Sequence, residues 1–103
     1  MQAFSLITFD RFSQRFCGLM GKRSISSRDV FHLTPCNSVH TWGMHFSLSI
    51  LFLDKQLQLL RFIDCLPPWR MVWHWRAHSV LELQAGIIFS EQHARQLLAT
   101  LFP

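Results

Sequence analysis

Short segments with a period of two constrain this chain more than any other feature of its sequence. The clearest runs from Phe46 to Leu53, where every even-numbered residue is a large apolar one and the odd-numbered residues are Ser, Ser, Leu and Leu. Successive side chains of a strand point to opposite faces of a sheet, so this pattern predicts a strand. Five further segments are predicted as strands on the same ground: Phe4–Phe9, Val30–Leu33, Leu57–Ile63, Arg70–Arg76 and Ser79–Leu83.

Two short helices are predicted at the margins. Asp10 can cap the first, in which Phe12, Phe16 and Leu19 recur at helical spacing and Gly18 or Gly21 ends the element. The second runs over Ser90–Leu98, with Ser90 as the cap and Glu91 in the first turn. Residues 99–102 either extend this helix or form a closing strand.

The chain of 103 residues is expected to form a single domain, residues 1–103. Half of its residues are hydrophobic and 16% are charged, which excludes a disordered segment. The links between the predicted strands are too short for helical crossovers, so a mainly antiparallel sheet is expected. The predicted fold is therefore mainly β: a compact antiparallel β-sandwich or barrel-like sheet with two short peripheral helices.

Location in the cytoplasm is expected from the cysteines and the apolar runs. Three cysteines form no CxxC pair, and the N-terminus lacks the features of a secretory signal. The longest apolar run away from the N-terminus, Ile50–Leu53, is far shorter than a membrane helix. We expect reduced thiols, no membrane association, and a monomer or weak homodimer.

A polar block from Pro35 to Met44 is the candidate binding site. Its functional groups, together with a carboxylate on a later strand, are expected to line one pocket for a small molecule or a protein; these residues are Cys36, Asn37, His40, Thr41, Trp42, Met44 and Glu82. The competing interpretation is structural, because Asn, Ser and Thr side chains often satisfy the backbone of irregular loops.

Two chemical alternatives involve the same block. Cys36 could be a nucleophile with His40 as its base, in a thiol-dependent hydrolase. Cys36, His40 and His45 could instead supply three zinc ligands, but no CxxC or HExxH motif accompanies them. We therefore expect no catalytic residue, no metal and no cofactor.

Tryptophans interleaved with basic residues suggest a weak binder of single-stranded nucleic acid as a further alternative. Trp69, Trp73 and Trp75 alternate with Arg70, His74 and Arg76. Alternation puts Trp73 and Trp75 on the side away from the charges, so the rings are expected to face the core. The formal charge of +4 is modest as well, and nucleic acid is not the expected partner.

Four segments in this order resemble the bacterial family Domain of Unknown Function 192: residues 18–21 (GLMG), 35–44 (PCNSVHTWGM), 51–54 (LFLD) and 80–86 (VLELQAG). The resemblance covers about Phe9 to Gly86 and implies a compact, mostly β domain with no established activity. The chain departs from the family pattern at Ser47–Ser49, where the family has Pro-Ile-Asp, at Gln56 and Leu57, where it has Asp-Gly, and near the C-terminus, where a Gly-Asp pair is missing. The expected function is a non-catalytic binding or accessory module.

Overall fold

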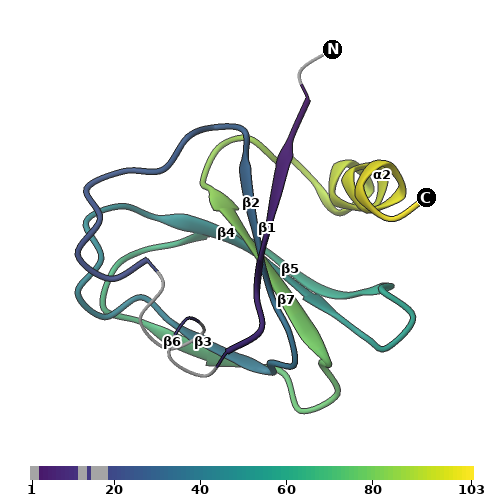
Figure 1. Cartoon of the computed structure of the whole chain (residues 1–103), viewed down its shortest axis with the longest axis horizontal. Helices are drawn as coiled ribbons and strands as arrows, with labels where there is room; N and C mark the ends of the chain where they lie inside the picture. The colour runs from purple at the N-terminus through teal and green to yellow at the C-terminus, as the bar shows by residue number, and fades with distance from the viewer. Residues whose placement is uncertain (1–2, 12–13, 15–18) are drawn as a thin grey trace.

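The computed structural model describes residues 3–11, 14 and 19–103 and contains two β-sheets and one helix within them. The larger sheet has five strands in the order β1 (Ser5–Phe9), β2 (Asp29–Leu33), β7 (Ser79–Gln84), β4 (Leu48–Leu53) and β5 (Leu59–Leu66). The smaller sheet pairs β3 (Ser38–His40) with β6 (Met71–Trp73), and the helix is α2 (Glu91–Leu101). The prediction of a mainly β fold is confirmed (Figure 1).

Parts of the prediction are corrected. Strands β1 and β2 run parallel, not antiparallel, because the link over residues 10–28 is long enough to return the chain to the same end of the sheet. Over the described residues the larger sheet is open, with β1 and β5 as its edges, so it is not a closed barrel. Of the two predicted helices, α2 is present, and the first falls largely on residues 12–13 and 15–18, outside the described part.

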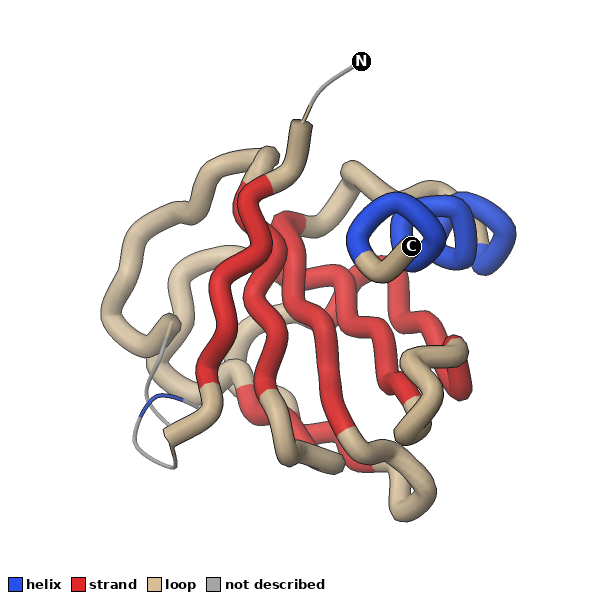
Figure 2. Tube along the Cα trace, turned by 45° about the vertical axis from the view of Figure 1, so that its right-hand side comes forward, coloured by secondary structure: helices blue, strands red, loops and turns tan. Residues whose placement is uncertain are grey.

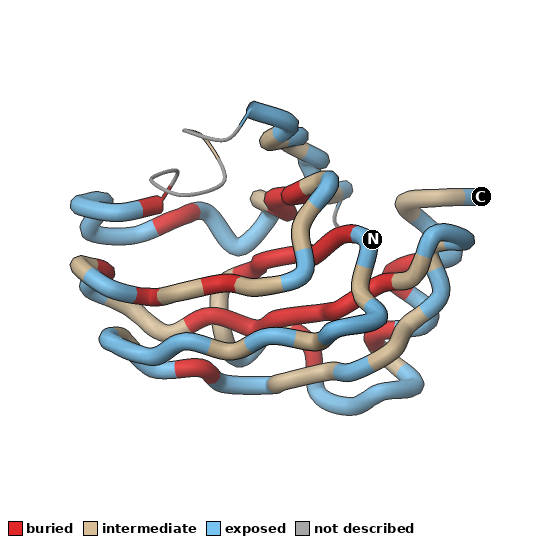
Figure 3. Tube along the Cα trace, turned by 90° about the horizontal axis from the view of Figure 1, so that it is seen from below, coloured by how far each residue is buried: buried red, intermediate tan, exposed pale blue. Residues whose placement is uncertain are grey.

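Apolar residues on both faces of the larger sheet build the core. On β4, Leu48, Ile50 and Phe52 join one buried cluster, whereas Leu51 and Leu53 join the other. This is the predicted alternation, and β4 is buried along its whole length because it lies between β7 and β5. Buried segments accordingly gather in the middle of the molecule (Figure 3).

The small sheet and α2 cover opposite faces of the larger sheet. Val39 and Val72 of the small sheet pack into the cluster that contains Phe52, and Leu97 and Leu98 of α2 pack into the cluster that contains Leu51. Figures 1 and 2 show the helix and the small sheet on different sides of the five strands. The small sheet therefore buries one of its faces and leaves the other outward.

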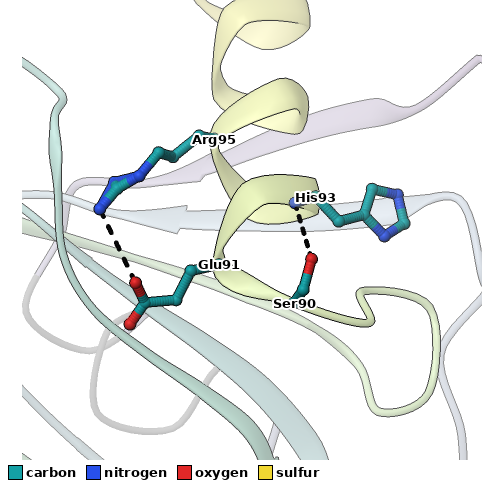
Figure 4. Close-up of polar contacts among 4 residues, drawn as sticks. All are labelled: Ser90, Glu91, His93 and Arg95. Carbon is teal, nitrogen blue, oxygen red and sulfur yellow. Dashed lines mark hydrogen bonds and ion pairs between the residues drawn. The ribbon is translucent and has the colours of Figure 1, made fainter.

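Helix α2 begins where the sequence predicts and extends further than predicted. The Ser90 side chain accepts a hydrogen bond from the His93 backbone N–H at 3.1 Å, and Glu91 lies 3.8 Å from Arg95 (Figure 4). The helix continues to Leu101, so residues 99–101 extend it and form no closing strand. Its buried residues are Ala94, Leu97 and Leu98, at the i, i+3, i+4 spacing of an amphipathic helix.

A hairpin joins β4 and β5, which pair antiparallel and correspond to two of the predicted strand segments. Asp54 accepts hydrogen bonds from the backbone N–H groups of Gln56 and Gln58 at 2.9 and 3.0 Å. Leu57 has a φ of 63°, the left-handed conformation that a glycine adopts at lower cost. The backbone at residue 57 therefore has a conformation that favours glycine, although this chain has leucine there.

Candidate functional site

The outward face of the small sheet is fixed by the register of its two strands. Val39 pairs with Val72 and both side chains point into the core, so their neighbours point outward. Ser38 pairs with Trp73, and His40 pairs with Met71. The outer face thus carries a polar side chain beside an apolar one at each of these two pairs.

The tryptophans near this face are exposed, and the prediction that their rings face the core is wrong. The exposed fractions are 66% for Trp69, 50% for Met71, 64% for Trp73 and 82% for Trp75. Only residues 71–73 of the predicted strand are in strand conformation, and the small, β-branched Val72 supplies the inward side chain. The alternation was recognised correctly, but the odd-numbered residues were assigned to the buried face. In β6 the even-numbered Val72 is the one that packs inward, and Met71 and Trp73 are exposed.

Thr41 is a structural residue that links the residue after β3 to the turn before β6 by hydrogen bonds. It is fully buried; its hydroxyl oxygen lies 2.7 Å from the Pro67 carbonyl oxygen and accepts a hydrogen bond from the Arg70 backbone N–H at 2.9 Å. The Thr41 backbone carbonyl accepts from the Trp69 N–H at 3.0 Å. These bonds fix the turn before β6, in which Trp69 has a φ of 64°, and so fix the direction of the exposed rings.

His40 and Trp42 form a stacked pair at one end of the outer face. Their ring centroids are 4.7 Å apart at an interplanar angle of 29°, and the Trp42 backbone N–H donates to His40 Nδ1 at 3.3 Å. Trp42 remains 40% exposed, whereas Met44, two residues later, is buried in the core. Met44 therefore contributes packing, and Trp42 adds a ring to the exposed surface.

Cys36 and Asn37 line a hollow of about 280 Å³ together with Pro35, Ala77 and His78. The Cys36 thiol donates to the Ser38 carbonyl at 2.9 Å and its side chain packs against the core cluster that contains Val39. Of the seven predicted site residues, these two are the ones that line this hollow. Ala77 and His78 were not predicted as site residues; they follow Trp75 and Arg76 directly in the sequence.

Glu82 lies inside the molecule, on β7. Its neighbours across the sheet are Phe31 and Ile50, which belong to the core cluster under the small sheet. Burial raises the pKa of its carboxyl from 4.5 to about 8, because no water solvates the charged form. Glu82 is thus on the inner side of the small sheet and His40 on the outer side, and the two do not share one surface.

The described residues contain no group of three or more His, Cys, Asp or Glu side chains that could hold a metal ion. The Cys36 thiol donates to the Ser38 carbonyl, and His40 Nδ1 accepts from the Trp42 backbone N–H. Among the helices in the described part of the chain, none is long and apolar enough to cross a membrane.

Comparison with known proteins gives a family and a fold. The family model of Domain of Unknown Function 192, described as an uncharacterized ACR, matches residues 1–93. No curated protein matches the chain.

Two solved structures have a similar fold. A protein from Sinorhizobium meliloti 1021 named "putative transcription regulator" is 18% identical, with a TM-score of 0.74 over 82% of this chain and 71% of its own. A protein of unknown function from Novosphingobium aromaticivorans DSM 12444 is 13% identical, with a TM-score of 0.75 over 88% of this chain and 69% of its own. At these identities the similarity establishes the fold alone.

Proposed function

The chain belongs to the Domain of Unknown Function 192 family, and from this premise we propose that it is a non-catalytic binding module. Its recognition surface is the outer face of the small sheet together with the exposed residues that directly follow β3 and that precede and follow β6. We call this surface the indole face; it consists of Ser38, His40, Trp42, Trp69, Arg70, Met71, Trp73, Trp75 and Arg76.

The exposure of its large apolar side chains carries the proposal. A tryptophan that stabilises the fold buries its ring, yet Trp69, Trp73 and Trp75 leave about two thirds or more of theirs in water. Contiguous exposed apolar patches mark interaction surfaces in soluble proteins, whereas single exposed apolar residues do not. The indole face therefore contributes little to folding and is available to a partner.

Its charge indicates which partner chemistry it suits. Segments 30–53 and 65–81 contain both strands of the small sheet, and neither contains an Asp or a Glu. Arg70 and Arg76 are exposed there, and the Arg76 guanidinium lies 5.9 Å from the centre of the Trp75 ring. A partner with anionic groups beside flat or apolar groups complements this surface.

Tryptophan emission tests the proposed function. Full-length protein is titrated with three probes: a single-stranded oligonucleotide, anionic phospholipid vesicles, and the protein itself at increasing concentration. The proposal expects at least one probe to shift the emission. Because replacing Trp69, Trp73 and Trp75 by Ala removes the emitting rings, binding to this variant is followed by a fluorescent label on the probe and is expected to be lost. No response to any probe, or a response that the triple variant retains, contradicts the proposal.

Location in the cytoplasm is part of the same proposal. The exposed thiol of Cys65 supports it, because such thiols persist in reducing compartments. Fractionation of the source cells is expected to recover the protein with cytoplasmic markers, and recovery with secreted proteins contradicts this location.

A further inference from the structure

Resting on the proposed function, we infer that the indole face binds single-stranded nucleic acid, with bases stacked on its exposed rings and phosphates on Arg70 and Arg76. Of the two grounds against nucleic acid, the modest formal charge of +4 is unchanged, and the other was that the rings face the core. The exposed fractions of Trp69, Trp73 and Trp75 remove that premise.

The arrangement of rings suits unpaired bases. Sheet proteins that bind single strands present aromatic side chains on an outward sheet face, where two or three bases stack. Trp73 lies on such a face, two residues from Met71, and this spacing is about 7 Å along a strand. Trp69 lies in the bend before β6 and Trp75 in the turn after it, and both rings are exposed, so exposed indoles occur on the strand and just beyond each of its ends.

Polar groups lie beside the rings, as base recognition requires. Ser38 is the cross-strand neighbour of Trp73, and His40 is that of Met71. Asn37 and His78 line the hollow of about 280 Å³, and the Asn37 carbonyl accepts a hydrogen bond from the His74 backbone N–H just after β6. Amide, hydroxyl and imidazole groups can exchange hydrogen bonds with base edges and sugar hydroxyls.

The same observations disfavour the two other occupants. A second copy of the chain would bring Arg70 and Arg76 against their own copies, and the strands of this face supply no carboxylate to neutralise them. A bilayer would place Ser38 and His40 against hydrocarbon, where their polar groups find no hydrogen-bonding partner. A single-stranded nucleic acid offers phosphates to the two arginines and hydrogen-bonding groups to Ser38 and His40.

Fluorescence anisotropy of a labelled oligothymidine of about ten nucleotides tests this inference on the full-length protein. Replacing Trp73 by Ala is expected to weaken binding about tenfold, and Trp73→Phe is expected to retain most of it. The matched control is Phe89→Ala, because Phe89 is also an exposed ring (80%) but lies beside α2, away from the indole face. Thermal melting verifies that each variant is folded, and Trp75→Ala repeats the test at a second ring.

Salt dependence separates phosphate contacts from other binding. Two phosphate contacts predict that the logarithm of the association constant falls with the logarithm of salt concentration with a slope of about −1.4. Arg76→Ala is expected to reduce the slope by about 0.7, whereas Arg95→Ala, on the exposed surface of α2, leaves it unchanged.

The outcomes distinguish this inference from the proposed function. If the oligonucleotide does not bind but anionic vesicles or a second copy do, through the same rings, the inference fails and the proposed function stands. If no probe binds, both fail. Binding that Trp73→Ala and Trp75→Ala leave unchanged also overturns the inference.

Discussion

Replacing Glu82 by Gln tests the burial of the carboxyl under the small sheet. Phe31 and Ile50 flank this carboxyl, and burial raises its pKa from 4.5 to about 8. Between these values the folded protein holds a proton that the unfolded chain has released. The free energy of unfolding of the wild type therefore falls as pH rises from 4.5 towards 8.

The size of this effect follows from the pKa difference. At about 1.36 kcal/mol per pKa unit, the full range corresponds to ~5 kcal/mol, and relaxation or water entry around the charged carboxylate would reduce it. Glu82→Gln has no titrating group at this position. Its stability relative to the wild type is therefore expected to increase with pH by a few kcal/mol between about pH 5 and about pH 8.

Urea unfolding followed by tryptophan fluorescence at several pH values measures this difference. Taking the difference cancels groups common to both proteins, including His32, whose pKa is lowered by burial and by His78 and which acts in the opposite direction. Glu91→Gln is the matched control, because the same substitution is made on the exposed surface of α2. A difference between wild type and Glu82→Gln that stays constant from about pH 5 to about pH 8 refutes the reasoning.

Three further substitutions test the framework of the fold. Thr41→Val removes the hydroxyl that bonds Pro67 and Arg70 and is expected to cost about 1–3 kcal/mol in urea unfolding, whereas Thr41→Ser costs less; equal stability of Thr41→Val and wild type contradicts this role. Ser90→Ala removes the cap of α2 and is expected to cost about 1 kcal/mol by thermal circular dichroism, with Ser90→Asp near wild type; a loss equal in both variants argues against capping. Phe52→Ala opens a cavity in a fully buried position and is expected to cost about 3–5 kcal/mol by urea unfolding, and a loss below about 1 kcal/mol is incompatible with the described core.

The strands that build the core could be predicted from the sequence, because burial on both faces imposes a regular apolar pattern. Residues 46–53 gave the correct strand and the correct division of its faces. The cap at Ser90 was equally local, since one side chain bonds the N–H group three residues later. The parallel pairing of β1 with β2 was missed, because the apolar pattern within a strand does not specify the direction in which it pairs.

The candidate site was harder to predict because exposure is decided by neighbours distant in sequence. Alternation in residues 70–76 fits two opposite assignments, and the pairing of Val72 with Val39 selects the one that turns Trp73 outward. The placement of Glu82 required the full order of the larger sheet, which brings Phe31 and Ile50 to either side of it.

Nuclear magnetic resonance of the indole N–H groups tests the central claim, that the indole face is the recognition surface, most directly. The chain has four tryptophans, and assignment by substitution gives each its own signal. On addition of a single-stranded oligonucleotide, the signals of Trp69, Trp73 and Trp75 are expected to shift together and to saturate with one dissociation constant. Shifts confined to backbone signals of α2 and the hairpin at residues 54–58, with unchanged indole signals, would contradict the account.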